Sequence, residues 1–267
     1  MAVLGGTPTG DSGEMGAGPT ERIALVTGAD RGLGLALTAG LLAKGWRVLA
    51  GQYLSEWPEL GALAEAHSGR LSLIPLDVGS DESVRAAASF AATMVDRIDL
   101  LVNNAGVNSP TTFRPIRESQ DYAEMRRLYN VNAVGPLRVA QAFLPLTDRG
   151  DLKRLCFVSS EAGSINRAER KSWYGYCCSK AALNMGVSML FNGLRPAGYT
   201  FRLYHPGWVR SYMRGTKNLQ AELEPEDAAR PALAYFLSDR GRDPHRDDRS
   251  DEDRLVLRDW RGREWPW

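Results

Sequence analysis

The chain has 267 residues, of which 43% are hydrophobic and 24% charged, values that are ordinary for a globular protein with one sizeable core. Its 33 lysines and arginines balance 32 aspartates and glutamates, which gives a formal net charge of +1, so no global electrostatic footprint points to nucleic acid or an anionic membrane as a partner. No run of about 18 apolar residues could cross a bilayer, and an odd number of cysteines, three, suits a reducing compartment, so we expect a cytoplasmic protein.

Residues 1–20 are rich in glycine, proline and threonine, and they have neither the basic start nor the continuous apolar stretch of a signal peptide. A segment of this composition cannot bury enough apolar surface to order itself. We therefore expect a disordered tail at 1–20, followed by a single domain at 21–267.

From residue 21 onward, short apolar runs alternate with longer helix-like segments, an order typical of βαβ units. The nearly continuous apolar character of the runs indicates strands that are buried on both faces. The predicted strands are residues 23–26, 47–50, 71–74, 98–102, 155–158 and 199–203, and the predicted helices are residues 33–44, 81–96, about 119–146 and about 174–194. The sequence thus predicts an α/β fold, with a doubly wound, Rossmann-type parallel sheet and helices on both of its faces.

The segment 239–254 carries seven acidic residues and five arginines and almost nothing apolar. Mixed charge usually keeps a segment solvated, so we predict a flexible insertion there, with an interaction segment as the alternative. Residues 255–257 could form a last strand, and Trp260, Trp265 and Trp267 follow it. Because exposed indoles favour aggregation, we expect these tryptophans to dock on the domain.

A glycine-rich turn directly follows the first predicted strand. Gly28, Gly32 and Gly34 lie between that strand and a helical pattern. The arrangement places backbone amides and the positive end of a helix dipole where a pyrophosphate can sit, and glycines let the backbone approach the phosphates. A turn of this kind can be purely structural, but on the first βα unit of a doubly wound pattern it predicts a dinucleotide site.

Tyr176 and Lys180 stand four residues apart, on one face of a predicted helix. A fixed ammonium near a phenol favours the phenolate and lowers the phenol pKa, which suits proton exchange with a carbonyl or alcohol oxygen. The same pair also occurs by chance on many helices. Ser160 ends the fifth predicted strand, at the sheet edge where ligands bind, although its hydroxyl could simply satisfy backbone groups.

These features occur in the order found in one known family. The glycine spacing resembles the TGxxxGxG turn of short-chain dehydrogenases/reductases, and residues 77–78, 103–106 and 206–209 are similar to the motifs that follow it in that family. Residues 179–184 and the tail at 259–267 resemble the C-factor and sniffer-like carbonyl reductase branch. The resemblance implies an oxidoreductase that moves a hydride between a nicotinamide cofactor and a carbonyl or secondary alcohol.

The resemblance also implies roles for four catalytic residues. Tyr176 would be the general acid in reduction and the base in oxidation, Lys180 would lower its pKa and hold the nicotinamide ribose, and Ser160 would position the substrate oxygen. Asn132 matches the asparagine that holds a water in the proton relay to the lysine. One departure is the interval between Ser160 and Tyr176, which is longer than is usual in the family.

NADP, as NADPH, is the expected cofactor, and NAD is the less favoured one. The second predicted strand ends without the acid that NAD enzymes place against the ribose, and Arg31 stands where basic residues meet the 2′-phosphate in NADP-using relatives. An exposed arginine on a turn is the alternative. The resemblance implies cofactor contacts from Gly28, Arg31, Gly32, Leu33, Gly34, Gln52, Asp77, Val78, Asn104, Ala105, Gly106, Tyr176, Lys180, Pro206, Gly207, Val209 and Ser211.

The substrate side of the site offers weaker signals. Trp173, Trp208 and Met213 could form apolar walls of a pocket, although each could equally belong to the core. His205 precedes a Pro-Gly turn near the expected cofactor, and a packing role is expected for it rather than a contact with the site. The expected partner is a small-molecule carbonyl or alcohol.

Two rival functions remain open at this point: a catalytically silent regulatory protein that senses nicotinamides, and an epimerase or dehydratase on the same fold. The intact Ser160, Tyr176 and Lys180 argue against a sensor, and the glycine spacing and chain length favour simple oxidoreduction. No metal site is predicted, because the adjacent Cys177 and Cys178 lack a second pair at metal-ligand spacing. We expect the chain to assemble as a homodimer or homotetramer.

Overall fold

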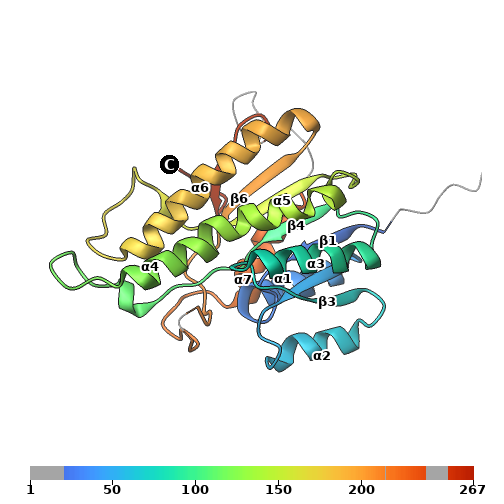
Figure 1. Cartoon of the computed structure of the whole chain (residues 1–267), viewed down its shortest axis with the longest axis horizontal. Helices are drawn as coiled ribbons and strands as arrows, with labels where there is room; N and C mark the ends of the chain where they lie inside the picture. Colours follow the sequence, from blue (N-terminus) through green and yellow to red (C-terminus); the bar gives the residue numbers. More distant parts are fainter. Residues whose placement is uncertain (1–20, 214, 239–251) are drawn as a thin grey trace, which may run out of the picture.

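The centre of the protein is an eight-stranded sheet in the order β3-β2-β1-β4-β5-β6-β7-β8 (Figure 1). It is seen in a computed structural model that describes residues 21–213, 215–238 and 252–267. Strands β1 to β7 are parallel to their neighbours, and β8 pairs antiparallel with β7. The strands are β1 (Ile23–Val26), β2 (Arg47–Gln52), β3 (Leu71–Pro75), β4 (Leu100–Asn103), β5 (Arg154–Val158), β6 (Thr200–His205), β7 (Leu257–Asp259) and β8 (Glu264–Trp265). The order in which β1 lies between β2 and β4 confirms the doubly wound prediction.

Helices cover both faces of this sheet, α3 to α6 on one side and α1, α2 and α7 on the other (Figure 1). The helices are α1 (Gly32–Ala43), α2 (Pro58–Ala66), α3 (Asp81–Met94), α4 (Tyr122–Tyr129), α5 (Gly135–Thr147), α6 (Tyr174–Leu194) and α7 (Pro225–Phe236). Three short 3-10 turns, η1 (Pro110–Thr112), η3 (Glu161–Gly163) and η4 (Arg195–Ala197), lie in the connections. The predicted α/β class is therefore confirmed.

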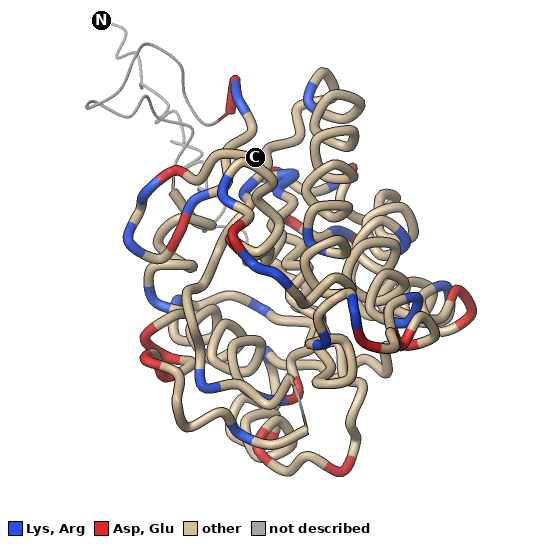
Figure 2. Tube along the Cα trace, turned by 90° about the vertical axis from the view of Figure 1, so that its left-hand side faces the viewer, with Lys and Arg blue, Asp and Glu red and all other residues tan. Residues whose placement is uncertain are grey.

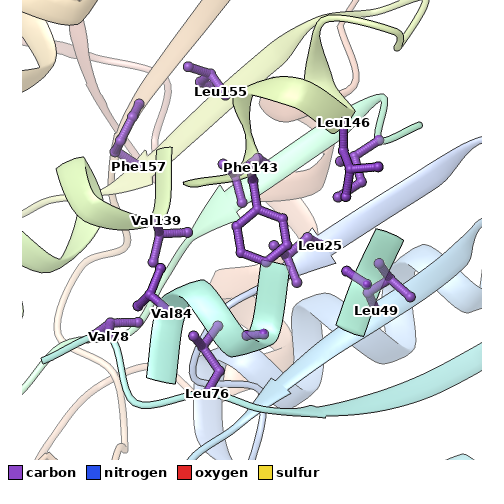
Figure 3. Close-up of a cluster of buried hydrophobic side chains, with 14 of the residues drawn as sticks. Leu25, Leu49, Leu76, Val78, Val84, Val139, Phe143, Leu146, Leu155 and Phe157 are labelled. Carbon is purple, nitrogen blue, oxygen red and sulfur yellow. The ribbon is translucent and has the colours of Figure 1, made fainter. Parts of the chain in front are cut away.

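The two helix layers create two apolar cores, one on each side of the sheet. Side chains of a strand alternate between its faces, so Leu25 of β1 joins one core whereas Ala24 and Val26 join the other. Figure 3 shows the first core, in which Phe143 of α5 lies among side chains from β1 and from α3, including Val84. Because both faces are covered, the strands are nearly continuous apolar runs, as the sequence indicated.

The long helical stretch predicted at about 119–146 is divided in the structure. Helix α4 begins after Asp121, whose side chain accepts a hydrogen bond from the Glu124 amide, and a π-helical turn, η2 (Asn130–Val134), separates it from α5. Pro136 stands in the first turn of α5, directly after the π turn, and it supplies no backbone N–H at this junction. The π turn, a feature often found at functional sites, carries Asn132.

The C-terminal tail packs on the domain. Trp260 contacts one core and Trp265 the other, and the Trp265 indole N–H donates to the carboxylate of the buried Asp259 at 3.1 Å. Residue Trp267 is 42% exposed, but its backbone carbonyl accepts a hydrogen bond from the Asn166 amide at 2.8 Å. The predicted docking of the tryptophans thus holds for the first two rings.

The charged segment ends earlier than predicted. Residues 1–20 and 239–251 lie outside the described residues, but Glu252 is described, and it forms ion pairs with two arginines. These arginines are Arg154 of β5 and Arg202 of β6, which are 0% and 2% exposed. The last residues of the segment are therefore not a solvated loop, and a deletion of 239–254 is not expected to be silent. Elsewhere on the described chain, basic and acidic residues are interspersed (Figure 2).

We predict that Glu252→Ala lowers the free energy of unfolding by about 3 kcal/mol, because it removes the carboxylate that neutralises two buried guanidinium groups. Asp253→Ala is the matched control, since Asp253 pairs with the exposed Arg195 and a surface ion pair contributes at most about 1 kcal/mol. Urea unfolding of the three proteins measures both effects. Equal losses in the two variants would contradict a structural role specific to Glu252.

Candidate active site

A cavity of about 980 Å³ opens at the carboxyl ends of β1, β4, β5 and β6. Ligands of doubly wound sheets bind at this edge. The predicted residues that line the cavity are Gly28, Arg31, Gly32, Leu33, Gly34, Asp77, Val78, Asn104, Ala105, Gly106, Ser160, Tyr176, Lys180, Pro206, Gly207, Val209 and Ser211. Of the predicted site residues, Gln52 and Asn132 lie outside this lining.

The glycine turn is held against the end of β4. A Cβ atom at Gly28 would stand 2.9 Å from the Ala105 Cα, and one at Gly34 would collide with the Gly28 carbonyl oxygen. The Asn104 side-chain amide donates to the backbone carbonyls of Thr27 and Gly28 at 3.0 and 3.1 Å. Only glycine therefore fits at positions 28 and 34, and Asn104 fixes the turn as well as lining the cavity.

Helix α1 begins at this turn and supplies a place for an anion. Its N-cap residue, Arg31, makes no side-chain cap hydrogen bond, and the first residues of the helix, Gly32, Leu33 and Gly34, line the cavity. The first amides of a helix need acceptors from outside the helix. The turn and the helix start together fit the pyrophosphate of a dinucleotide.

The end of β2 differs in detail from the prediction. Gln52 pairs with Pro75 in the sheet and its carbonyl accepts from Leu76, whereas the next two residues, Tyr53 and Leu54, line the cavity. Their amides both donate to one carboxylate oxygen of Asp30 at 2.9 Å. Asp30, which the sequence analysis did not single out, thus ties the glycine turn to the loop after β2.

The predicted reacting groups come together at the other end of the cavity. Tyr176, in the first turn of α6, is hydrogen-bonded to the Ser160 hydroxyl. The Lys180 ammonium donates to the Val158 carbonyl at 3.0 Å and lies 5.9 Å from the centre of the Tyr176 ring. All three reacting side chains are at most 9% exposed. The long interval between Ser160 and Tyr176 is taken up by η3 and the loop after it, so it does not separate the two hydroxyls.

Burial controls the protonation of these groups. It raises the pKa of Tyr176 to about 12, although the Ser160 hydrogen bond opposes the rise, and it lowers the pKa of Lys180 to about 8. We expected the ammonium to lower the tyrosine pKa; among the described residues, desolvation is the larger effect. At neutral pH the chain therefore holds a neutral phenol beside a mostly charged ammonium.

Asn132 is fully buried in the π turn and acts on the backbone of a neighbouring segment. Its side-chain oxygen accepts from the Val107 amide at 2.8 Å, and its side-chain nitrogen donates to the Val107 carbonyl at 2.9 Å and to the Ser179 hydroxyl at 3.0 Å. A Cβ at Gly106 would stand 3.4 Å from the Asn132 oxygen and 3.7 Å from the Lys180 nitrogen. Asn132 thus connects the segment after β4 to α6, next to Lys180.

The substrate side of the cavity has an aromatic wall that the sequence indicated only in part. Trp173 lines the cavity, stacks on Phe113 at 4.4 Å between ring centres and lies edge-on to Tyr176 at 6.4 Å. The Arg170 guanidinium lies over Trp173 and forms two hydrogen bonds, 2.6 and 2.8 Å long, with the Glu161 carboxylate. The Glu161 and Arg170 pair gave no sequence signal, because it joins a strand end to a loop without a motif.

His205 lines the cavity as well, with its Nδ1 atom buried and without a hydrogen-bond partner among the described residues. Its ring lies edge-on to Trp265 at 5.8 Å. We expected packing for His205, and the structure gives it both this packing contact and a place in the cavity wall. At the neighbouring Gly207, a Cβ would stand 2.6 Å from the Trp260 indole nitrogen, so the tail also supports this wall.

The chain belongs to the short-chain dehydrogenase family, whose model matches residues 22–222. Members of the family are oxidoreductases that act on CH–OH or carbonyl groups with NAD(P), and this protein is an oxidoreductase of that class. The sequence-based assignment to the family is confirmed.

Three similar proteins show how far the likeness extends. The C-signal protein of Myxococcus xanthus is 38% identical over 170 residues, which cover 64% of this chain and 93% of the relative. A short-chain dehydrogenase/reductase from Burkholderia multivorans, solved with bound NADP, is 31% identical with a TM-score of 0.78 and covers 92% of this chain and 100% of its own. The NADPH-bound carbonyl reductase from chicken fatty liver is 28% identical with a TM-score of 0.78, over 92% of this chain and 94% of its own.

No group of three potential metal ligands comes together in the described part of the chain. None of the helices within it is long and apolar enough to span a membrane.

We predict that His205 makes the fold sensitive to acid. Burial lowers its pKa from 6.5 to about 4, so the unfolded chain binds a proton near pH 6.5 that the folded chain does not bind until about pH 4. The contribution of neutral His205 to the free energy of unfolding is therefore complete above pH 6.5 and is lost as the pH falls toward 4. The loss amounts to roughly 2 to 4 kcal/mol. Urea unfolding of the wild type and His205→Gln at pH 7 and pH 5 measures this loss. The variant should show the smaller decrease, and equal decreases would contradict the assignment.

Proposed function

We propose that this oxidoreductase is an NADP-dependent carbonyl reductase, which transfers a hydride between nicotinamide and a carbonyl or secondary alcohol. The observation that carries the proposal is a single cavity that is lined both by reacting side chains and by a turn suited to phosphate. Ser160, Tyr176 and Lys180 lie at one end, and the glycine turn with Arg31 lies at the other. A protein that only sensed nicotinamides would have no use for the three reacting groups.

The residues of the cavity fit a nicotinamide dinucleotide. The glycine turn and the start of α1 would hold the pyrophosphate, and Asp77 and Val78 after β3 would contact the adenine. The segment at 104–106 and the residues Pro206, Gly207, Val209 and Ser211 would surround the nicotinamide. When bound, the cofactor supplies the hydride.

The protein's own part in the reaction is to position the substrate oxygen and to move one proton. In reduction, Tyr176 donates its phenolic proton to the carbonyl oxygen while the Ser160 hydroxyl orients that oxygen. Lys180 then stabilises the phenolate by its charge, and Asn132 supports the position of Lys180 through the segment at Val107. Burial keeps the Tyr176 phenol protonated, which is the form that donates a proton in reduction.

We base the proposed preference for NADPH on the position of Arg31. Its guanidinium lines the phosphate end of the cavity, and a guanidinium can bind a 2′-phosphate through paired hydrogen bonds. Tyr53 and Leu54, which line the cavity after β2, carry no charge that would repel a phosphate. The NADP-bound relative and the NADPH-bound carbonyl reductase support the same choice.

We also propose a cytoplasmic homodimer or homotetramer that acts on small molecules. All three cysteines are free, which suits a reducing compartment. Exposed apolar side chains on α4 and α6, at Tyr122, Tyr129, Met185 and Met189, support contact with a further copy of the chain.

We predict that Tyr176→Phe lowers kcat for carbonyl reduction by at least about 100-fold, because it removes the proton donor and little volume. The Kd for NADPH should change by less than about threefold, since the fold and the glycine turn remain. Tyr174→Phe is the matched control, because this neighbouring phenol donates to the Lys171 carbonyl at 3.3 Å and lies outside the cavity lining. Stopped-flow kinetics measures kcat, and fluorescence titration measures the Kd for NADPH. A Tyr176→Phe variant with more than about a tenth of the wild-type kcat would overturn the assignment of Tyr176 as the proton donor.

Arg31→Ala should weaken NADPH binding by about 10- to 100-fold and leave NADH binding nearly unchanged, because a charge-assisted contact contributes about 1.5 to 3 kcal/mol. Arg22→Ala serves as the control, since Arg22 also lies over a tryptophan ring, Trp46 at 5.7 Å, but outside the cavity lining. Calorimetric titration with both cofactors is the measurement. Equal weakening of the two cofactors would show that Arg31 does not recognise the 2′-phosphate.

A further inference from the structure

Two aromatic rings surround the guanidinium of Arg31. It lies 4.4 Å from the ring centre of Trp57 and 5.1 Å from that of Tyr212. The two rings pack edge to face, with 5.0 Å between their centres. One guanidinium N–H also donates to the Tyr212 backbone carbonyl at 3.3 Å. Trp57 immediately precedes α2, and Tyr212 belongs to the loop between β6 and α7, so three separate segments meet at this arginine. We name Trp57 and Tyr212 the aromatic clamp.

The clamp restricts Arg31 without occupying all of its donors. A guanidinium has five N–H donors in one plane, and contacts with aromatic rings are attractive while they leave most of these donors available. The Trp57 indole N–H is buried and has no hydrogen-bond partner among the described residues. The contacts that the structure gives this indole are those of its ring, with the Arg31 guanidinium and the Tyr212 ring.

Tyr212 also connects Arg31 with the substrate side of the cavity. The next residue, Met213, lines the cavity, and its carbonyl accepts from the Asn108 amide at 3.4 Å, beyond the segment at 104–106. The carbonyl of Ser211, on the other side of Tyr212, accepts from Asn218 at 3.0 Å. The bond between Ser211 and Asn218 lies within the loop that carries Tyr212. This loop contacts Arg31 through Tyr212 and Asn108 through Met213.

We propose that the aromatic clamp holds Arg31 ready for a 2′-phosphate and so determines cofactor specificity. We also propose that it transmits occupancy of that subsite to the loop that carries Tyr212, which the structure describes at residues 209–213 and 215–223. The inference rests on the proposed preference for NADPH. A bound 2′-phosphate restricts the guanidinium and thereby stabilises the contacts that the guanidinium makes with Tyr212. A ligand without that phosphate does not touch the guanidinium and leaves these contacts as they are in the free protein. Trp57 and Tyr212 are positioning residues and take no part in the chemistry.

The first test uses fragments and needs no turnover. The affinities of 2′,5′-ADP and 5′-AMP are measured by calorimetry for the wild type, Trp57→Ala, Tyr212→Ala and Tyr212→Phe. In each alanine variant the preference for 2′,5′-ADP should fall about 3- to 10-fold, the range of a partly exposed cation–π contact. Tyr212→Phe should retain the preference because it keeps the ring and the backbone carbonyl.

Binding of 5′-AMP separates the possible outcomes. Unchanged 5′-AMP affinity shows that an alanine variant is folded and that its loss concerns the phosphate, whereas equal losses for both fragments would overturn the clamp. A full preference in both alanine variants would also overturn it, while the NADPH proposal would stand. A wild type without any preference would overturn the NADPH proposal, and the clamp with it.

The second test follows the loop itself by hydrogen exchange of peptides that cover residues 209–223. Saturating 2′,5′-ADP should slow exchange there at least about threefold in the wild type and in Tyr212→Phe, and 5′-AMP should not. In Tyr212→Ala the slowing should be lost even when 2′,5′-ADP is saturating. Equal protection by both fragments, or protection that persists in Tyr212→Ala, would contradict the coupling.

Discussion

The site depends on the contact between the end of β1 and the end of β4. The Thr27 hydroxyl accepts hydrogen bonds from the amides of Asn104 and Ala105, both 3.0 Å long, while the Asn104 side chain holds the carbonyls of the glycine turn. This contact brings two backbones so close that a side chain at Gly28 would strike Ala105. Because the turn, the start of α1 and the nicotinamide side of the cavity all extend from these two strand ends, one set of hydrogen bonds fixes their relative positions.

Burial then gives the reacting groups their protonation states. The side chains of Tyr176 and Lys180 project from α6 toward the end of β5 and are almost fully buried. Desolvation moves their pKa values apart, to about 12 for the tyrosine and about 8 for the lysine. Neutral phenol and charged ammonium are the forms needed to donate a proton and to stabilise the anion that remains. The fold thus prepares the pair for reduction before any ligand contributes its own charge.

Much of the fold could be predicted from local sequence pattern. The bounds of β1 and α6 agree with the predicted segments, because an apolar run buried on both faces and an uninterrupted helical pattern are strong local signals. The π turn before α5 could not be predicted, since one wider turn hardly changes helical periodicity. The glycine turn, Ser160, Tyr176 and Lys180 were predictable because each belongs to an ordered set of motifs.

Contacts between distant segments were beyond sequence reasoning. The Glu161 and Arg170 pair, and the approach of Trp57 and Tyr212 to Arg31, depend on how loops fold back, which no periodicity records. The structural role of Glu252 did have a signal, because arginines at positions 154 and 202 interrupt strands that are otherwise apolar, and a buried guanidinium requires a carboxylate or several carbonyls. In a segment of mixed charge that signal was outweighed by the general expectation of solvation.

The central claim is that the cavity carries out reduction of a carbonyl with hydride from NADPH. The most direct measurement follows deuterium from NADPH that is labelled at both C4 positions of the nicotinamide during incubation of the protein with a panel of ketones and aldehydes. The account predicts an alcohol product that carries one deuterium on the former carbonyl carbon, formed by the wild type and not by Tyr176→Phe. A wild type that binds NADPH tightly but transfers no deuterium to any carbonyl would contradict it, and would instead describe a protein that binds the cofactor without turnover.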